Sequence, residues 1–180
     1  MNNNFFEQNW NTEELPLIKF NKEDLAKLGL GDDLISTLSE IGLPVQASPY
    51  LSFNMKTLNN IQKEGLGKFV QIGNIDNGDS IVIDVKVGSI DIFSHEDNAI
   101  VCSMNSTLSK LYMNLISFEN FIGKIQENYG EDAYLDLDFP LSEIELLEQE
   151  LLSNDESFNE QENFWKNEVS QMKDEIQLNG

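Results

Sequence analysis

The hydrophobic positions in the first third of the chain are spaced for helices rather than strands. Leu34, Leu38 and Ile41 follow an i, i+4, i+7 spacing, which predicts a helix that begins near residue 32 and turns one apolar face to the core. Gly42 is expected to end this helix in a left-handed conformation, and Pro44 prevents its continuation.

A shorter helix is predicted just before this one, and a polar segment precedes both. Asn21 is placed to cap the short helix and Gly29 to end it. Residues 1–16 carry scattered aromatic residues without a clear period, so they form either a frayed N-terminal arm or a docking segment. The remaining length and its apolar content suit one domain, over residues 17–180.

Between residues 69 and 104 the pattern changes to short β-branched runs separated by turn residues. The runs are FVQIG, SIVIDV, SIDIF and AIVCSM, and the intervening NIDNGD and VKVG are expected to be turns. Alternation places the isoleucines of the second and third runs on one face and Asp84 and Asp91 on the other. This predicts an antiparallel meander with one buried face and one wetter face.

Helical spacing returns after the meander. Asn105 or Ser106 is expected to cap the longest helix, which ends at Gly130 and packs across the sheet. The segment YLDLDF has the alternation of a strand, and LSEIEL then begins another helix through a capping box of Ser142 and Glu145. A last helix is predicted from a further set of apolar residues, Phe164, Trp165, Val169 and Met172. Together these elements predict an α+β fold, with a central, mostly antiparallel sheet flanked by helices.

Charge adds a prediction about partners. The chain has 32 acidic residues against 11 basic ones, which gives a formal net charge of −21 at pH 7. Nucleic acid and anionic membranes would repel such a molecule, so neither is expected to bind, and the partner is expected to be basic. The region from Glu131 to Gly180 holds much of the acid, and it is either a docking surface or only a solvated helical face.

Cysteine usage and the N-terminus indicate a compartment. Cys102 is the only cysteine, so no intramolecular disulfide can form, which fits a reducing environment. Cys102 itself is expected to be a small buried hydrophobe in a strand. The N-terminus lacks a basic region followed by an apolar core, and no stretch approaches the roughly 20 apolar residues of a membrane span. These features predict a cytoplasmic protein.

Candidate catalytic residues are few. The one histidine, His95, lies in the polar turn FSHEDN after a strand, and nothing nearby has the two-histidine spacing of a metalloenzyme helix. Asp84 and Asp91 are either a carboxylate pair for acid and base catalysis or solvated residues of an outer face. No glycine-rich loop leads into a helix with Lys and Ser or Thr, as phosphate binding requires. We therefore predict no catalytic residue, no metal and no cofactor.

Several segments, taken in order, resemble the SUKH superfamily, in particular its fourth subfamily of bacterial immunity proteins (Smi/Knr-like). LSEIGLPVQASPYLSF resembles the subfamily's helix end and following turn, and FVQIGNIDNGDSIVIDVKVGSIDIF resembles its central meander. VCSMNSTLSKLYMNLISFENFI resembles its strand, Asn-Ser turn and long helix, and ENFWKNEV resembles the start of its final helix. The resemblance runs from about residue 15 to residue 172, and the segment LNNIQKEGLGKF departs from it.

The resemblance implies a non-catalytic immunity protein that neutralises a cognate bacterial toxin, often a nuclease in this superfamily, by stoichiometric protein binding. An alternative, also found in the superfamily, is a cytoplasmic scaffold or regulatory binding module. A third class is an enzyme or small-molecule binder that uses Asp84 and Asp91.

For the leading function, acidic residues of the meander turns and of the C-terminal region are expected to contact the toxin, in place of the phosphates that it binds. These residues are Asp76, Asp79, Asp84, Asp91, Glu96, Asp97, Glu160 and Glu162.

Overall fold

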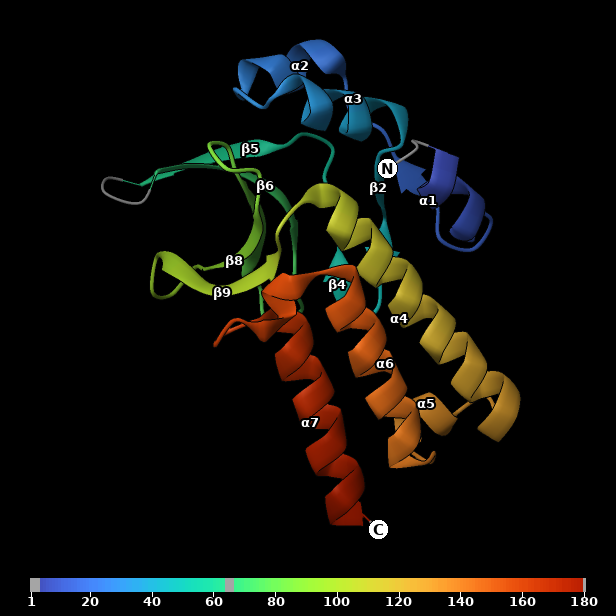
Figure 1. The fold of residues 1–180 in the computed structure, drawn as a ribbon. Coiled ribbons are helices and arrows are strands. Elements are labelled where there is room, and N and C mark those ends of the chain that lie inside the picture. The colour runs from blue at the N-terminus through green and yellow to red at the C-terminus, as the bar shows by residue number, and fades with distance from the viewer. Residues whose placement is uncertain (1–3, 64–66, 180) are drawn as a thin grey trace.

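A curled antiparallel sheet lies beside a group of helices in the computed structural model, which describes residues 4–63 and 67–179 (Figure 1). Residues 1–3 of the predicted arm, residues 64–66 of the segment that departs from the SUKH pattern, and Gly180 lie outside the described residues. The predicted α+β fold, with a mostly antiparallel sheet and flanking helices, is confirmed.

The helices, in chain order, are α1 (Asn4–Asn9), α2 (Lys22–Lys27), α3 (Asp32–Glu40), α4 (Leu108–Tyr129), α5 (Ala133–Asp136), α6 (Leu141–Asn154), the short 3-10 helix η1 (Glu156–Asn159) and α7 (Phe164–Asn179). The strands are β1 (Leu17–Ile18), β2 (Leu43–Pro44), β3 (Gln46–Ala47), β4 (Leu51–Ser52), β5 (Asn59–Lys63), β6 (Gly67–Asn74), β7 (Ser80–Asp84), β8 (Ile90–Ser94) and β9 (Ala99–Asn105). Strands β1 and β2 pair with each other, and the larger sheet has the order β3-β4-β6-β7-β8-β9, with β5 also paired to β6.

The predicted meander is formed by β6 to β9, in which each strand pairs antiparallel with the next. The register shifts between Gln71 and Gly73 in β6 and again between β8 and β9, and such bulges bend and twist a strand. A glycine is required at position 73, because an added Cβ would lie 2.6 Å from the Ser52 carbonyl oxygen and 2.8 Å from the Phe53 ring. This close approach allows β4 to pair with the end of β6.

The two faces of the meander differ from the prediction in one respect. The isoleucines of β7 and β8 are buried in the main core against the helices, as expected. The opposite face is not simply wet, because Phe69, Val82 and Phe93 form a second, smaller buried cluster on it. Asp84 pairs with Phe69 and Asp91 with Val82, so both aspartates share a face with this cluster. The curl of the sheet therefore shelters a face that alternation alone assigned to solvent.

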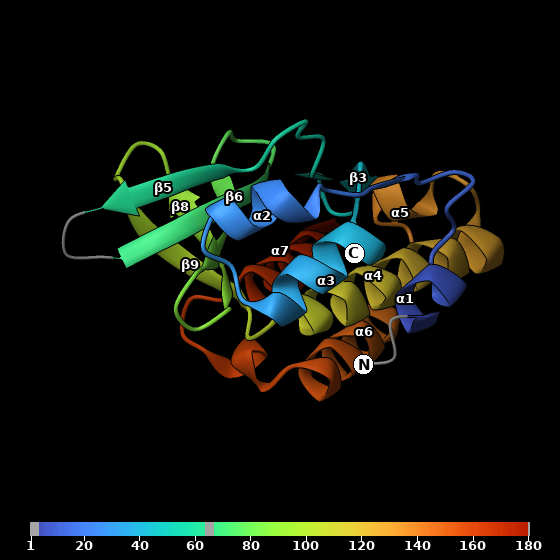
Figure 2. The ribbon, with the colours of Figure 1, turned by 90° about the horizontal axis from the view of Figure 1, so that it is seen from above.

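The helices predicted before and after the meander are present. The Asn21 side chain caps α2 by accepting hydrogen bonds from the N–H groups of Glu23 and Asp24. Gly42 follows α3 with φ of 87°, and an added Cβ there would lie 2.1 Å from the Ile18 carbonyl oxygen. Helix α4 is the longest and lies between α3 and α6 when the molecule is seen from above (Figure 2).

The N-terminal segment is part of the packed body. Phe6 of α1 is buried and stacks on Tyr112 of α4, with ring centroids 4.3 Å apart, and on Trp10 at 5.0 Å. The indole N–H of Trp10 donates to the Leu15 carbonyl oxygen at 2.9 Å. The described residues of this segment therefore dock on the body of the protein, against α4, and are not frayed.

The predicted N-cap of α4 is wrong by one or two residues. Thr107 occupies the cap position, and its hydroxyl accepts a hydrogen bond from the Lys110 N–H at 3.2 Å. Asn105 and Ser106 do not cap the helix, because both bind the carboxylate of Asp155 instead.

Two further local predictions in the C-terminal half are wrong. YLDLDF is not a strand: its first residues belong to α5, which packs through Tyr134 edge-on against Phe121 of α4 and ends at Leu137 with φ of 52°. The capping box of α6 does not form, because the helix begins after Pro140 and already includes Ser142. Tertiary packing decides both positions.

The linker between α6 and α7 pairs with the end of β9 at one edge of the sheet. The Ser103 N–H of β9 donates to the Glu162 carbonyl oxygen at 3.0 Å, and Ser103 forms a parallel bridge with Asn163. The Asn163 amide also donates to the Met104 carbonyl oxygen at 3.2 Å. The linker thus occupies the outer hydrogen-bonding positions at the end of β9.

Candidate partner-binding surface

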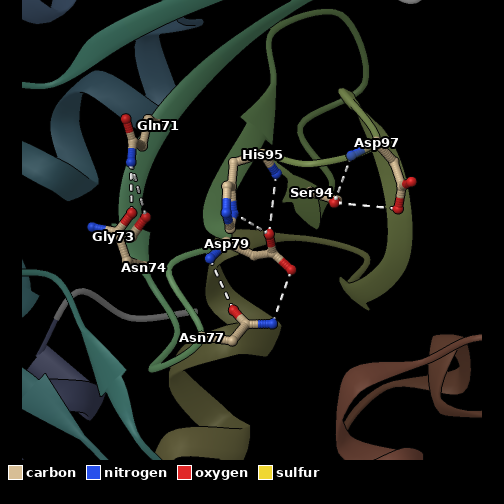
Figure 3. A network of polar contacts seen from close by, with 8 residues as sticks. All are labelled: Gln71, Gly73, Asn74, Asn77, Asp79, Ser94, His95 and Asp97. Atoms are coloured by element: carbon tan, nitrogen blue, oxygen red, sulfur yellow. Dashed lines mark hydrogen bonds and ion pairs between the residues drawn. The ribbon is translucent and has the colours of Figure 1, made fainter.

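Two turns of the meander meet at one end of the sheet and carry four of the predicted partner-binding residues (Figure 3). We call residues 75–79, between β6 and β7, and residues 95–98, between β8 and β9, the acidic turn pair. Asp79 joins them, because one of its carboxylate oxygens accepts from the His95 backbone N–H at 3.0 Å and lies 2.8 Å from the imidazole Nδ1. The other oxygen accepts from the Asn77 side-chain amide at 3.0 Å.

Asp79 is a structural anchor rather than a free contact. Only 13% of its side chain is exposed. Desolvation acts to raise the pKa of Asp79, but the hydrogen bonds from the His95 backbone and side chain and from Asn77 outweigh it and lower the pKa. The ionised carboxylate therefore holds the two turns together and fixes the positions of their exposed acids.

Three other acids of the acidic turn pair face solvent. Asp76, Glu96 and Asp97 are exposed. Asp97 is also held in place, because its N–H donates to the Ser94 hydroxyl at 3.1 Å and its carboxylate lies 3.3 Å from the same hydroxyl. This end of the sheet can therefore present negative charge in a defined arrangement, which favours binding of a rigid basic surface.

Asp84 and Asp91 lie toward the opposite end of the meander. One Asp84 oxygen accepts from the backbone N–H groups of Lys86 and Val87, at 2.7 and 3.1 Å, and so stabilises the β7–β8 turn. Burial raises the pKa of Asp91, the hydrogen bond from the Ser89 hydroxyl opposes this shift, and repulsion by nearby carboxylates adds to it. The structure places these aspartates apart from the acidic turn pair.

Glu160 and Glu162 are exposed in the linker that runs along β9. Glu160 is near enough to Asp91 to contribute to its raised pKa. Burial, followed by repulsion from Glu162, Asp91 and other acids, raises the pKa of the Cys102 thiol to about 12. Cys102 is therefore a protonated residue of a strand, as predicted, but it is half-buried rather than fully buried.

Asp155, in the same acidic linker, has a role that the sequence pattern missed. It is 3% exposed, and its carboxylate accepts from the N–H groups of Ser106 and Ser157 and from the Asn105 amide, at 2.8, 3.1 and 3.1 Å. The Asn105 carbonyl oxygen in turn accepts from the indole N–H of Trp165 at 2.9 Å. This network joins β9, the turn before α4, η1 and α7. The spacing of Asp155 and Ser157 suits a local side-chain turn, and this was the one signal available in the sequence.

A second acidic site, also missed by the sequence analysis, lies on α7. Burial is the main cause that raises the pKa of Glu168 to about 7, and repulsion by Asp76 of the acidic turn pair adds to it. Glu168 lines a small hollow with Tyr50, from the turn between β3 and β4, and Tyr134 of α5. No periodicity connects these three residues, because they come from distant parts of the chain.

The chemistry available at this surface is that of carboxylates and aromatic rings. Within residues 4–63 and 67–179, no group of three or more His, Cys, Asp or Glu side chains is placed to hold a metal ion. In the same residues, no helix combines the length and the apolar character that crossing a membrane requires. Comparisons of the chain with protein families, with curated proteins and with solved structures find no match.

Proposed function

We propose that this protein is a non-catalytic immunity protein of the SUKH type, which binds a cognate bacterial toxin in the cytoplasm and blocks its basic active surface. The observation that carries the proposal is the acidic turn pair. Its exposed acids extend from two turns that Asp79 ties together, and Asp76 lies near Glu168 of α7. A fixed anionic surface of this kind accelerates association with a basic partner and selects its orientation.

The segments that resemble the SUKH immunity proteins also have clear physical roles, which supports the proposal. Gly73, of the Ile-Gly pair, allows the close approach of β4. Asn105, of the Asn-Ser turn, and Trp165, of the Phe-Trp pair, bind each other in the buried network around Asp155. The resembling segments thus account for how the fold is held together, while the exposed acids account for binding.

The decisive experiment is co-expression with the product of the adjacent gene, scored by cell survival and by co-purification. We expect the protein to rescue growth and to form a complex that dissociates as salt is raised. Survival with no complex would contradict stoichiometric binding, and a stable complex with a harmless partner would favour the scaffold alternative.

A pair of variants makes the site test specific. Replacing Asp76 by Asn and Glu96 by Gln removes two exposed charges from the acidic turn pair, and we expect the association rate to fall about tenfold at low salt. The control replaces Glu13 and Glu14 by Gln, which removes the same charge from another exposed segment. Equal rates for the two variants would mean that net charge alone, and not this surface, attracts the partner.

The remaining alternative, catalysis by Asp84 and Asp91, is tested by replacing both with Asn. We expect this variant to protect cells as well as the parent protein, because the proposed surface lies at the other end of the meander. Loss of protection by a folded variant that still binds the toxin would favour the catalytic alternative.

A further inference from the structure

The hollow beside Glu168, which we call the α7 hollow, combines exposed aromatic and aliphatic side chains with carboxylates. Tyr50, Tyr134 and Leu135 line one side, and Glu168, Met172 and Glu175 of α7 line the other. Its free volume is about 100 Å³. Sites for small molecules usually enclose roughly 300–1,000 Å³. The α7 hollow is therefore the size of one side-chain head group.

The wall opposite α7 is presented by two unusual backbone positions. Tyr50 has φ of 57° and is 68% exposed, at a turn whose Ser48 N–H donates to the Glu119 carboxylate of α4 at 2.7 Å. Leu135 is 71% exposed on α5, a short helix that ends in the left-handed Leu137. Large apolar side chains this exposed are typical of interaction sites when they cluster around a pocket.

The carboxylates of the α7 hollow have no cationic partner within the described residues. Glu175 accepts a hydrogen bond from the Gln171 amide at 2.9 Å, and Glu168 has no hydrogen bond or ion pair there. The two glutamates are seven residues apart, so they lie on the same side of α7. Burial and then the nearby Asp76 raise the pKa of Glu168 to about 7, which means that a cation at this position would relieve an unfavourable negative charge.

We propose that the α7 hollow receives one arginine or lysine side chain of the basic partner protein. The aliphatic stem packs on Leu135 and Met172, the cationic group lies against Tyr50, and Glu168 and Glu175 neutralise its charge. Cation–π contact and carboxylate pairing act together in such a site, and arginine satisfies both best because its planar group can stack and donate in two directions. This inference rests on the proposed function for the identity of the partner, but not for the chemistry of the hollow.

The chemistry is tested by titrating the ¹⁵N-labelled protein with N-acetyl-argininamide and following backbone amide shifts by NMR at about pH 8, where Glu168 is ionised. We expect saturable shifts centred on Tyr50, Leu135 and Glu168. N-acetyl-citrullinamide, which has the same shape without the charge, should bind at least about tenfold more weakly. Equal shifts from the two probes, or no shifts in this region, would overturn the proposal.

Variants separate the hollow from general electrostatics. Replacing Glu168 and Glu175 by Gln should weaken binding of the arginine probe about tenfold, whereas the Glu13 and Glu14 control should leave it unchanged. Tyr50→Phe should retain binding and Tyr50→Ala should lose it, because the ring face is the contact. Circular dichroism checks that each variant is folded. The same loss in both glutamine pairs would contradict a local site.

The partner's use of the hollow is tested separately, in the co-purification assay. The Glu168 and Glu175 variant should release the toxin faster than the control does. Equal release rates for the two would overturn the role of the hollow as an anchor while leaving the proposed function intact. Failure to find any toxin would overturn the proposed function. The titration with N-acetyl-argininamide would still show whether the α7 hollow binds a cationic side chain.

Discussion

Asp155 is buried, although its charged neighbours in the sequence are exposed. It lies in SNDESFNEQEN, where most charged side chains are exposed, yet its carboxylate is buried and accepts three hydrogen bonds. Burial acts to raise its pKa, but the hydrogen bonds from Ser106, Asn105 and Ser157 outweigh this effect and lower it. The buried carboxylate is therefore ionised and stabilises the fold.

This leads to a prediction about pH. The pKa of Asp155 is lowered in the folded protein. The ionised carboxylate therefore contributes its full stabilisation above the ordinary pKa of 3.8, and this stabilisation is lost as the pH falls below that value. Asp155→Asn should cost about 2 kcal/mol of unfolding free energy near pH 6, and the difference should shrink below pH 4. Urea unfolding at several pH values measures it, with Glu156→Gln, an exposed neighbour, as the control. A difference independent of pH would contradict this role of the carboxylate.

Asn114 is the opposite case, a buried amide without partners. It is fully buried in α4, and neither its amide nitrogen nor its oxygen has a hydrogen-bond partner within the described residues. Asn114→Ala should raise the unfolding free energy by about 1 kcal/mol, because it removes an unsatisfied group and improves helix propensity. Asn120→Ala, exposed on the same helix, gains only the propensity and should give a smaller increase. Denaturant unfolding compares the two, and destabilisation by Asn114→Ala would contradict this account.

At the scale of elements, the hydrophobic period predicts those that are long enough to show one. The meander and α4 contain several repeats of their pattern, so local sequence and tertiary packing agree. Helix α1 has six residues and α5 has four, too few for a helical period to emerge. The alternation in YLDLDF is real, but packing of α5 against α4 overrides it.

The bulge in β6 can be tested through its glycine. Gly73→Ala should cost about 3 kcal/mol of stability or more, because the new methyl group would collide with the Ser52 backbone and the Phe53 ring. Gly123→Ala is the control, since an added Cβ there meets no atom within 4 Å, and it should stabilise α4. Thermal unfolding distinguishes them, and a mild effect of Gly73→Ala would mean that β4 can move away from β6.

Docking of α1 gives a second prediction at this scale. Trp10→Ala should lower the unfolding free energy by about 3 kcal/mol, because it removes a buried ring that packs on Phe6 and a hydrogen bond to Leu15. Phe5→Ala, at a 42% exposed position, should have little effect. Denaturant unfolding measures both. No loss of stability in Trp10→Ala would contradict a stabilising role for this segment.

For the whole molecule, the exposed acids of the candidate partner-binding surface could be predicted from the sequence, but the way in which the fold brings them together could not. Turn composition identified Asp76, Glu96 and Asp97 as exposed acids. The order of the strands in the sheet determines which turns lie next to each other. The contact between Asp79 and His95 is a consequence of that order. The α7 hollow combines residues from three distant segments, so no local pattern could indicate it.

The net charge of −21 has a cost in stability for the free protein. Acids on the acidic turn pair, the linker and α7 repel one another, and this repulsion adds to the effect of burial in raising the pKa values of Asp91 and Glu168. Salt should screen this repulsion, so the melting temperature should rise by about 5 °C between low salt and about 0.5 M NaCl. Scanning calorimetry measures the shift, and KCl should reproduce it if ionic strength is the cause. A falling melting temperature would contradict this account.

The pairing of the linker with β9 determines how another molecule can approach that side. Because Glu162 and Asn163 occupy the outer positions beside Ser103, a foreign peptide cannot extend the sheet there by adding a strand. A molecule that approaches this edge contacts side chains of the linker instead, including the exposed Glu160 and Glu162. The contacts open to a molecule that approaches this edge are thus those of the linker side chains, and substitutions there can change these contacts without rebuilding the sheet.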